Sequence, residues 1–252
     1  MAHDHVGIPR FIERGFSIND RTYVYNIEKH KIYQTNVDRL GTRNDYYEEY
    51  VEKEILKKFE DEFSTFYNEY TKITDSNSLV VLLNQNKSIV EKYMSFMYFR
   101  SKKVLDDINK YSRSSKIFGE LSHSSLLEIN SEININPISI LGDEYKILPV
   151  KNDSKLNFIN NSIGYSIIAF AKKHIIFFIP LNSKLGIAIT SIDKYLENSC
   201  LFIESSDDYT VNEINKATCR TEYEIGNGFI FGLDRQDVCQ YKSFLDTAYK
   251  NE

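Results

Sequence analysis

The chain has 252 residues, of which 42% are hydrophobic and 27% charged, and its formal net charge is −5. This length predicts one large domain or two small ones, and the composition excludes collagen-like, coiled-coil and disordered chains. Because acidic residues outnumber basic ones, 36 to 31, the chain lacks the electrostatic signature of a general nucleic-acid binder, and nucleic acid is expected only through a local patch.

The N-terminal segment lacks the basic and apolar regions of a signal peptide. No apolar run approaches the roughly 20 residues that span a bilayer, so we expect a soluble, cytoplasmic protein without membrane contact. The three cysteines form no C-x-x-C pair, which argues against structural zinc and disulfides. Abundant Asn, Ile, Lys and Tyr, whose codons are rich in A and T, favour a low-GC bacterium or one of its phages as the source.

The first predicted element is a hairpin over residues 16–37, where aromatic and β-branched residues nearly alternate around a polar turn. A long helix follows, because apolar residues recur at three- and four-residue steps from Tyr47 to Tyr70. Thr42 and Asp45 resemble the capping box at its start.

A second helix is predicted over about residues 87–111, with its apolar residues again on one side. The polar segment 71–78 joins the two helices, which should pack as an antiparallel pair.

Beyond residue 130 the pattern changes to short strands. Isoleucines alternate with polar residues over 133–140, interrupted by Pro137, which predicts an edge strand or an irregular one. Further short apolar runs, typical of a meander, occur at 156–159, 165–170, 175–181, 185–189 and 200–203.

Two late helices flank one more strand. Thr210 and Glu213 form a capping box for a helix that ends near Gly226, and residues 228–232 predict a short strand. Asp234 is expected to cap the last helix.

Helices followed by strands predict an α+β fold, with an N-terminal hairpin, two long packed helices, a mainly antiparallel sheet and two late helices. We expect a single domain over residues 1–252. Its helical lobe covers about 40–128, and its sheet lobe covers about 130–252 together with the hairpin.

The segment from His5 to Phe16 reads His-Val-Gly-Ile-Pro-Arg-Phe-Ile-Glu-Arg-Gly-Phe, and a Tyr-Tyr pair and an acidic helix follow the hairpin. This order resembles the bacterial domain-of-unknown-function family 4238, whose members open with His, small residues, Ile or Val, Pro and a stretch ending in Phe. The aromatic segment that ends at Arg100, and Asn215 with Arg220, resemble later parts of the same family. The resemblance implies an order of elements and no particular reaction.

Family members often carry a Ser-Asp-Asn-Pro or similar stretch after a strand in the C-terminal half. The corresponding residues here, 158–165, include Asn160 and Asn161 but no Asp. If that Asp is catalytic in relatives, this chain has lost it or uses an amide in its place.

Three residues are candidate catalytic groups. His5 titrates near neutral pH and is a candidate general base or metal ligand; alternatively, its ring anchors the N-terminus on a backbone carbonyl. Glu52 and Glu60 lie two turns apart on neighbouring faces of an ideal helix, and either could join His5 at a divalent metal. Alternatively, both belong to a solvated face with lysine partners.

Five residues are candidate ligand-binding groups. Arg10, Arg14 and Arg100 could each hold a phosphate or carboxylate through a bidentate guanidinium. The alternatives are ion pairs with the acidic helix for the first two, and a carboxylate or aromatic partner for Arg100. Asn161 and Asn215 complete the candidate set.

The chain contains no Walker loop, no G-x-S-x-G elbow, no H-E-x-x-H and no deaminase motif. The function expected first is therefore a binding or regulatory module in phage–host conflict that acts through protein contacts. The alternative is a metal-dependent hydrolase, nuclease-like effector or toxin, with a divalent metal as cofactor, in which His5 and Glu52 or Glu60 activate water. Convergence of the candidate side chains in one cleft favours the enzyme, and separate ion pairs favour the binding module.

Overall fold

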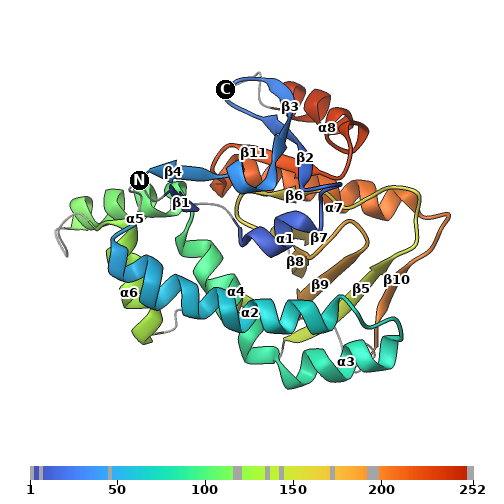
Figure 1. The fold of residues 1–252 in the computed structure, drawn as a ribbon, viewed down its shortest axis with the longest axis horizontal. Coiled ribbons are helices and arrows are strands. Elements are labelled where there is room, and N and C mark those ends of the chain that lie inside the picture. Colours follow the sequence, from blue (N-terminus) through green and yellow to red (C-terminus); the bar gives the residue numbers. More distant parts are fainter. Residues whose placement is uncertain are drawn as a thin grey trace.

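The computed structural model describes residues 3–5, 8–44, 47–115, 121–133, 137–141, 145–170, 174–191 and 199–248. Its helices and mainly antiparallel sheets confirm the α+β class. Figure 1 shows helices α2 to α6 gathered on one side of the molecule and the largest sheet on the other.

The α-helices are α1 (Arg10–Arg14), α2 (Lys57–Tyr70), α3 (Ser76–Gln85), α4 (Lys87–Phe99), α5 (Lys102–Ser115), α6 (His123–Ile133), α7 (Asp208–Ile225) and α8 (Arg235–Ala248). A π-helical segment, Val51–Leu56, leads into α2, and 3-10 turns occur at Val37–Arg39 and Pro137–Leu141. The strands are β1 (His3–His5), β2 (Arg21–Asn26), β3 (Lys31–Asn36), β4 (Thr42–Asn44), β5 (Lys146–Asn152), β6 (Asn160–Asn161), β7 (Ser166–Phe170), β8 (His174–Pro180), β9 (Leu185–Thr190), β10 (Leu201–Ile203) and β11 (Phe229–Gly232).

The five-stranded sheet has the order β10-β5-β9-β8-β7, and only the β10–β5 pair is parallel. Its strands are rich in isoleucine because both faces are covered, by α7 on one side and by α2 and α3 on the other (Figure 1). The Tyr67 hydroxyl donates to the Leu181 carbonyl at 3.3 Å, and that of Tyr70 donates to the Gly186 carbonyl at 3.1 Å. These bonds fix α2 on the sheet.

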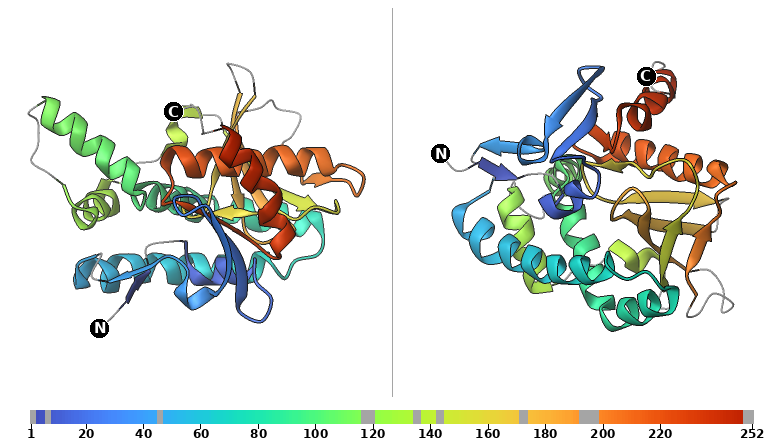
Figure 2. Two further views of the ribbon diagram at one scale, coloured as in Figure 1. Left: turned by 90° about the horizontal axis from the view of Figure 1, so that it is seen from above. Right: turned by 45° about the vertical axis from the view of Figure 1, so that its right-hand side comes forward.

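The four-stranded sheet, β3-β2-β11-β6, joins distant parts of the sequence. The predicted N-terminal hairpin is confirmed as β2 and β3, and β11 pairs with β2 so that Ile230 lies opposite Tyr25. Helix α8 packs on this sheet, and the Tyr25 hydroxyl donates to Asp246 on α8 at 2.7 Å. Figure 2 shows α7 between α8 and the five-stranded sheet.

The helical region begins later than the sequence pattern predicts. Thr42 does not cap a helix but lies in β4, which pairs with β1, and Asp45 lies outside the described residues. The β-pairing with the N-terminal segment takes up the backbone groups that a helical start would have used. The first regular α-helical turns therefore belong to α2, after the π-helical segment.

The helix predicted over 87–111 is divided into α4 and α5, and the two predicted helices are not joined directly, because α3 intervenes. The division lies at Arg100 and Ser101. Arg100 ends α4, and the Ser101 hydroxyl accepts the Val104 N–H at 3.2 Å. A serine that bonds the N–H three residues ahead starts a new helix, which explains the break.

The strand predicted over 133–140 is wrong. Helix α6 extends to Ile133, and Pro137 begins a 3-10 turn that buries Ile138, while Ile135 lies outside the described residues. Proline lacks an N–H and fits the first position of a helical turn. The alternation of isoleucines here reflects two helical ends instead of a strand.

The capping box at Thr210 is also wrong. Asp207 is the N-cap of α7 and accepts the Thr210 N–H at 3.0 Å, whereas Glu213 pairs with Lys216 at 2.7 Å. The predicted end at Gly226 is confirmed. Asp234 accepts the Asp237 N–H at 2.9 Å before α8, as expected.

One apolar core connects the helical region to the five-stranded sheet. It contains Phe63 and Tyr93 from the helices together with Phe178 and Ile187 from the sheet. We propose from this shared core that the chain is a single domain. Urea unfolding followed by tyrosine fluorescence and by far-UV circular dichroism should then give one coincident transition, and two separated transitions would contradict a single domain.

Within the described residues, no helix has the length and apolarity needed to cross a membrane.

Candidate functional site

The N-terminal motif forms β1 and α1, and its apolar side chains enter the core. Pro9 stands at the N-cap of α1, where its missing N–H leaves no gap in the helix. His5 lies opposite Thr42 in the β1–β4 pair, but its side chain, predicted as a general base or metal ligand, lies outside the described part of the structure. The fully buried residues of the motif are Ile8, Ile12, Glu13 and Phe16.

Arg10 and Arg14 lie one turn apart on the exposed side of α1. Arg14 pairs with Asp20 at 3.3 Å, and both arginines approach Asp38, at 4.0 Å for Arg10 and 3.7 Å for Arg14. Their partners are thus carboxylates near the hairpin and not the acidic helix. Such exposed pairs contribute about 0–1 kcal/mol each, and among the described residues neither arginine contacts Arg100.

Arg100 is the centre of a buried group that we call the Arg100 cluster: Arg100, Tyr47, Glu52, Glu60 and Tyr93. Arg100 is 1% exposed and donates from Nη1 to Glu60 Oε1 at 3.0 Å. The centre of the Tyr47 ring lies 5.9 Å from the guanidinium carbon. Because the Glu60 side chain is 32% exposed, the cluster reaches solvent there. Two predicted site residues, Glu60 and Arg100, therefore form an ion pair, and Glu52 acts electrostatically on Tyr47 beside them.

The π-helical segment turns Glu52 and Glu60 toward one face of the helix. On an ideal α-helix, eight residues would turn them about 80° apart. A π-helical turn, with hydrogen bonds from i to i+5, contains more residues than an α-helical turn. Each residue therefore turns the chain through a smaller angle about the helix axis. The smaller total rotation between the two residues brings their carboxylates closer to one face of the helix. Burial raises the pKa of Tyr47; Arg100 opposes this shift, and both carboxylates add to it. Single π-turns occur frequently at functional sites.

The Arg100 guanidinium stays charged inside the protein. Burial lowers the pKa of Arg100, but Tyr47 and Glu60 beside it raise it further, and the net shift is upward. A permanently charged cation next to a carboxylate and a tyrosine ring can fix a hydroxyl or a water for proton transfer. Among the described side chains, no three His, Cys, Asp or Glu groups are placed to hold a metal ion.

Tyr93 connects the Arg100 cluster to the sheet. Its hydroxyl donates to the Gly164 carbonyl at 3.3 Å. Gly164 has φ +69°, and a Cβ there would lie 2.1 Å from the Tyr93 hydroxyl and 2.5 Å from Ile8 Cγ2, so only glycine fits. The segment after β6 thus covers the cluster beside the N-terminal motif.

Asn161 and Asn215 belong to a separate buried network. Asn161 donates from Nδ2 to the carbonyls of Tyr165 and Thr218, at 2.7 and 3.3 Å. Asn215 accepts the Ile159 N–H at 3.1 Å and donates to the Asn157 carbonyl at 2.8 Å. Asn215 thus binds the loop that leads into β6, whereas Asn161 binds the segment after β6 and the backbone of α7.

Glu222 is a fully buried carboxylate near the end of α7 that the sequence analysis missed. It accepts the Ser162 N–H at 2.8 Å, the Ser162 hydroxyl at 2.7 Å, and the N–H groups of Gly228 and Phe229 at 2.5 and 2.9 Å. Burial raises the pKa of Glu222 to about 7, although these hydrogen bonds oppose the shift. A negative charge in the last turn of a helix interacts unfavourably with the helix dipole. This unfavourable position is the feature of the sequence that could have pointed to Glu222.

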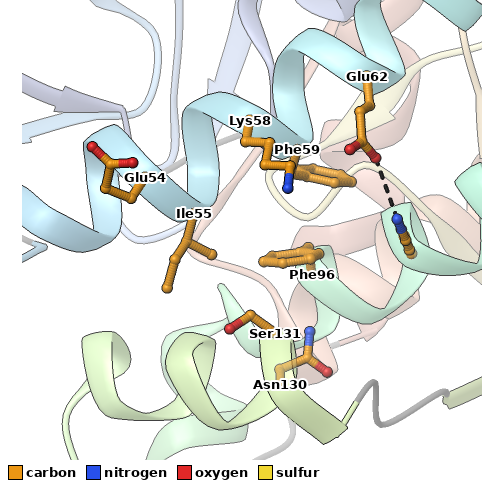
Figure 3. Close-up of a pocket in the computed structure, with 9 residues that line it drawn as sticks. Glu54, Ile55, Lys58, Phe59, Glu62, Phe96, Asn130 and Ser131 are labelled. Carbon is orange, nitrogen blue, oxygen red and sulfur yellow. Dashed lines mark hydrogen bonds and ion pairs between the residues drawn. The ribbon is translucent and has the colours of Figure 1, made fainter.

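A pocket of about 370 Å³ opens between α2, α4 and α6 (Figure 3). We call it the α2–α4–α6 pocket. Phe59 and Phe96 stack in its wall with ring centres 4.5 Å apart, and Lys92 pairs with Glu62 at 3.3 Å. Asn130 accepts the Ser95 hydroxyl at 2.7 Å through Oδ1, which leaves its Nδ2 group directed toward Phe96 and the pocket (Figure 3). The lining residues are Glu54, Ile55, Lys58, Phe59, Glu62, Lys92, Phe96, Asn130 and Ser131.

The sequence pattern gave no sign of this pocket. Phe59 falls in the apolar stripe of the first predicted helix, Phe96 falls in the aromatic segment that ends at Arg100, and Lys58 falls among the lysines on the solvated faces of the first helix. The pocket arises where the chain turns from α4 through α5 to α6, which no local periodicity encodes.

One of the comparisons with known proteins gives a match, and it covers the N-terminal half of the chain. No curated protein and no solved structure matches the chain. The family described as "Protein of unknown function (DUF4238)" matches residues 5–132. This range contains the N-terminal motif, the Arg100 cluster and every residue of the α2–α4–α6 pocket, whereas Asn161 and Asn215 lie beyond it. The chain belongs to the DUF4238 family.

Proposed function

We propose that the protein is a binding module that recognises a partner protein through the α2–α4–α6 pocket. The observation that carries this proposal is Asn130, which is 1% exposed and whose Nδ2 group has no hydrogen-bond partner among the described residues. A buried donor without an acceptor costs about 1–3 kcal/mol. A carbonyl or carboxylate oxygen bound in the pocket would remove that cost.

The pocket wall defines the chemistry of the ligand. The stacked rings of Phe59 and Phe96 offer an apolar surface, and Lys58 forms no ion pair within the described part of the chain, unlike Lys92. The best match is a peptide segment with an aromatic or aliphatic side chain next to an acidic one. Interfaces are commonly anchored by one such buried side chain.

We include in this proposal a regulatory role in phage–host conflict in the bacterial cytoplasm, supported by the lack of a recognisable catalytic motif and by the acidic net charge. Plaque counts on cells that carry the wild type or Lys58→Gln test that role. Equal phage yields with both chains, and with neither chain present, would contradict it.

The pocket is tested with two dipeptides, N-acetyl-Phe-Glu-amide and N-acetyl-Phe-Gln-amide, titrated into ¹⁵N-labelled protein and followed by NMR. We expect shifts at Asn130 and at Phe96, with the acidic peptide binding about three- to tenfold more tightly, as for one charge-assisted hydrogen bond. Lys58→Gln should abolish this preference, and Asn130→Leu should weaken both peptides.

The matched control is Lys57→Gln, which removes the neighbouring charge on α2 but does not alter the pocket lining. It should leave both affinities unchanged. Equal binding of the two peptides by the wild type, or shifts that map away from the pocket, would overturn the proposal.

A hydrolase, either a nuclease-like effector or a toxin, is the second candidate function, and the π-helical segment favours it. This segment turns Glu52 and Glu60 toward one face of the helix, and both carboxylates act on Tyr47, which lies beside Arg100. In this proposal the two carboxylates orient an attacking water or a divalent metal, together with His5, and the arginine stabilises the charge that develops on a phosphate.

Thermal unfolding with Mg²⁺ or Mn²⁺ and cleavage of short DNA and RNA test the hydrolase. Metal at 100 times its dissociation constant should stabilise the fold by about 2.7 kcal/mol, which at this size raises the Tm by about 5–10 °C. His5→Ala, Glu52→Gln and Glu60→Gln should each remove the shift and the cleavage, while Glu69→Gln, at the far end of α2, should keep both. No shift and no cleavage with the wild type would reject this candidate.

A further inference from the structure

A second cavity, of about 550 Å³, lies between α7 and the five-stranded sheet. We call it the sheet–α7 cavity. It lies outside the residues that match the family and shares no residue with the α2–α4–α6 pocket. Its volume falls within the range of about 300–1,000 Å³ that is typical of small-molecule sites.

The strand register gives the cavity a continuous apolar floor. Ile168 pairs with Ile176, and Phe178 pairs with Ala188. Paired residues in antiparallel strands lie on the same face, and Ile176 and Phe178, two residues apart on β8, share that face. The two adjacent pairs therefore form one apolar row of side chains that runs diagonally across three strands. Ala188 has the smallest side chain of the row and leaves open space between the sheet and the opposite wall. On α7 that wall is Ala217, also a small residue.

The charged groups that line the cavity are not equivalent. Asp207 is occupied as the N-cap of α7, and Glu213 is paired with Lys216 at 2.7 Å. Arg220 forms no ion pair within the described residues; its guanidinium carbon lies 5.5 Å from the centre of the Phe244 ring. Among the described lining residues, Arg220 is therefore the one cation without an ion-pair partner, and both acidic groups are already engaged.

The rim of the cavity is apolar as well. Phe202 and Tyr209 both line it, and they are 55% and 73% exposed. Together with the apolar cavity they form an exposed apolar patch, and such patches often mark ligand-binding sites. An elongated ligand whose end emerges between them would cover both rings.

We propose that the sheet–α7 cavity binds a fatty-acid-like monocarboxylate. The acyl chain lies along the floor that contains Ala188, and the carboxylate pairs with Arg220. This proposal is independent of the proposed function, because the two sites share no residue.

Isothermal titration calorimetry tests the proposal. The ligands are octanoate, decanoate and 1-decanol, each kept below the concentration at which it forms micelles or separates from solution. We expect saturable binding of one decanoate per chain, about fourfold tighter for each added methylene group. 1-Decanol should bind at least fivefold more weakly than decanoate. Arg220→Gln should abolish that difference, whereas Arg235→Gln, an exposed cation on α8, should retain it.

Ala188→Phe fills the cavity and should weaken decanoate at least tenfold with an unchanged circular dichroism spectrum. If this variant does not fold, Ala217→Leu fills the same space from α7 and decides the matter. Non-saturable binding, or full affinity in a folded variant with a filled cavity, would overturn the assignment. An unchanged preference for decanoate in Arg220→Gln would overturn the role of the arginine.

Discussion

Replacing Arg100 by alanine should lower the free energy of unfolding by about 3–5 kcal/mol, the usual cost of removing one partner from a buried ion pair. The change removes a large side chain that is 1% exposed. It also leaves the Glu60 carboxylate, which Arg100 binds at 3.0 Å, without its cation. At about 2–4 °C per kcal/mol for a chain of this size, the Tm should fall by about 6–20 °C.

The matched control is Arg14→Ala, which removes an arginine whose side chain is 54% exposed and should cost about 0–1 kcal/mol. Chemical denaturation of both variants and the wild type, fitted for midpoint and slope, measures the difference. Equal losses for the two variants would show that the Arg100 cluster does not hold the helical region to the rest of the core.

Glu222 should make stability fall as the pH rises from about 4.5 to about 7. Its pKa is raised from 4.5 to about 7 by burial, so below this range the carboxyl is protonated in both the folded and unfolded states. Within the range the unfolded chain releases the proton first, which favours unfolding. The shift corresponds to about 3 kcal/mol at 1.36 kcal/mol for each pKa unit.

Urea unfolding of the wild type and of Glu222→Gln at several pH values measures this effect as the difference between the two curves. The variant cannot titrate at this position, so its stability should change less over the range. Glu224→Gln, an exposed residue two positions further along α7, should retain the slope of the wild type. A constant difference between the wild type and Glu222→Gln across the range would contradict the raised pKa.

Local patterns predicted those elements whose stability depends on neighbours in the sequence. The alternation in 16–37 correctly predicted β2 and β3, and the runs near 165–170, 175–181 and 185–189 correctly predicted β7, β8 and β9. Alternation and apolar runs report burial on a pleated surface. The strand β5 was missed because Pro149 and flanking lysines interrupt its apolar pattern, although both of its edges are paired.

The candidate site was predictable only in part, because its geometry depends on features that periodicity does not contain. Glu52, Glu60 and Arg100 were singled out from the sequence, and Glu60 does pair with Arg100. The orientation of Glu52 relative to Glu60 depends on a π-helical segment, which has no distinct local pattern. Glu222 was missed because Ser162, which binds it, is distant in the sequence, and because Gly228 and Phe229 lie where a turn leads into β11.

The pairing of β2 with β11 has a consequence for synthesis of the chain. About 200 residues separate the two strands, so at about 5–20 residues per second the ribosome needs roughly 10–40 s to deliver the partner of β2. During that interval the hairpin presents an unpaired strand edge, the kind of surface that templates aggregation. A nascent chain arrested before β11 should therefore bind chaperones or aggregate, whereas the full-length chain is released once that edge is covered.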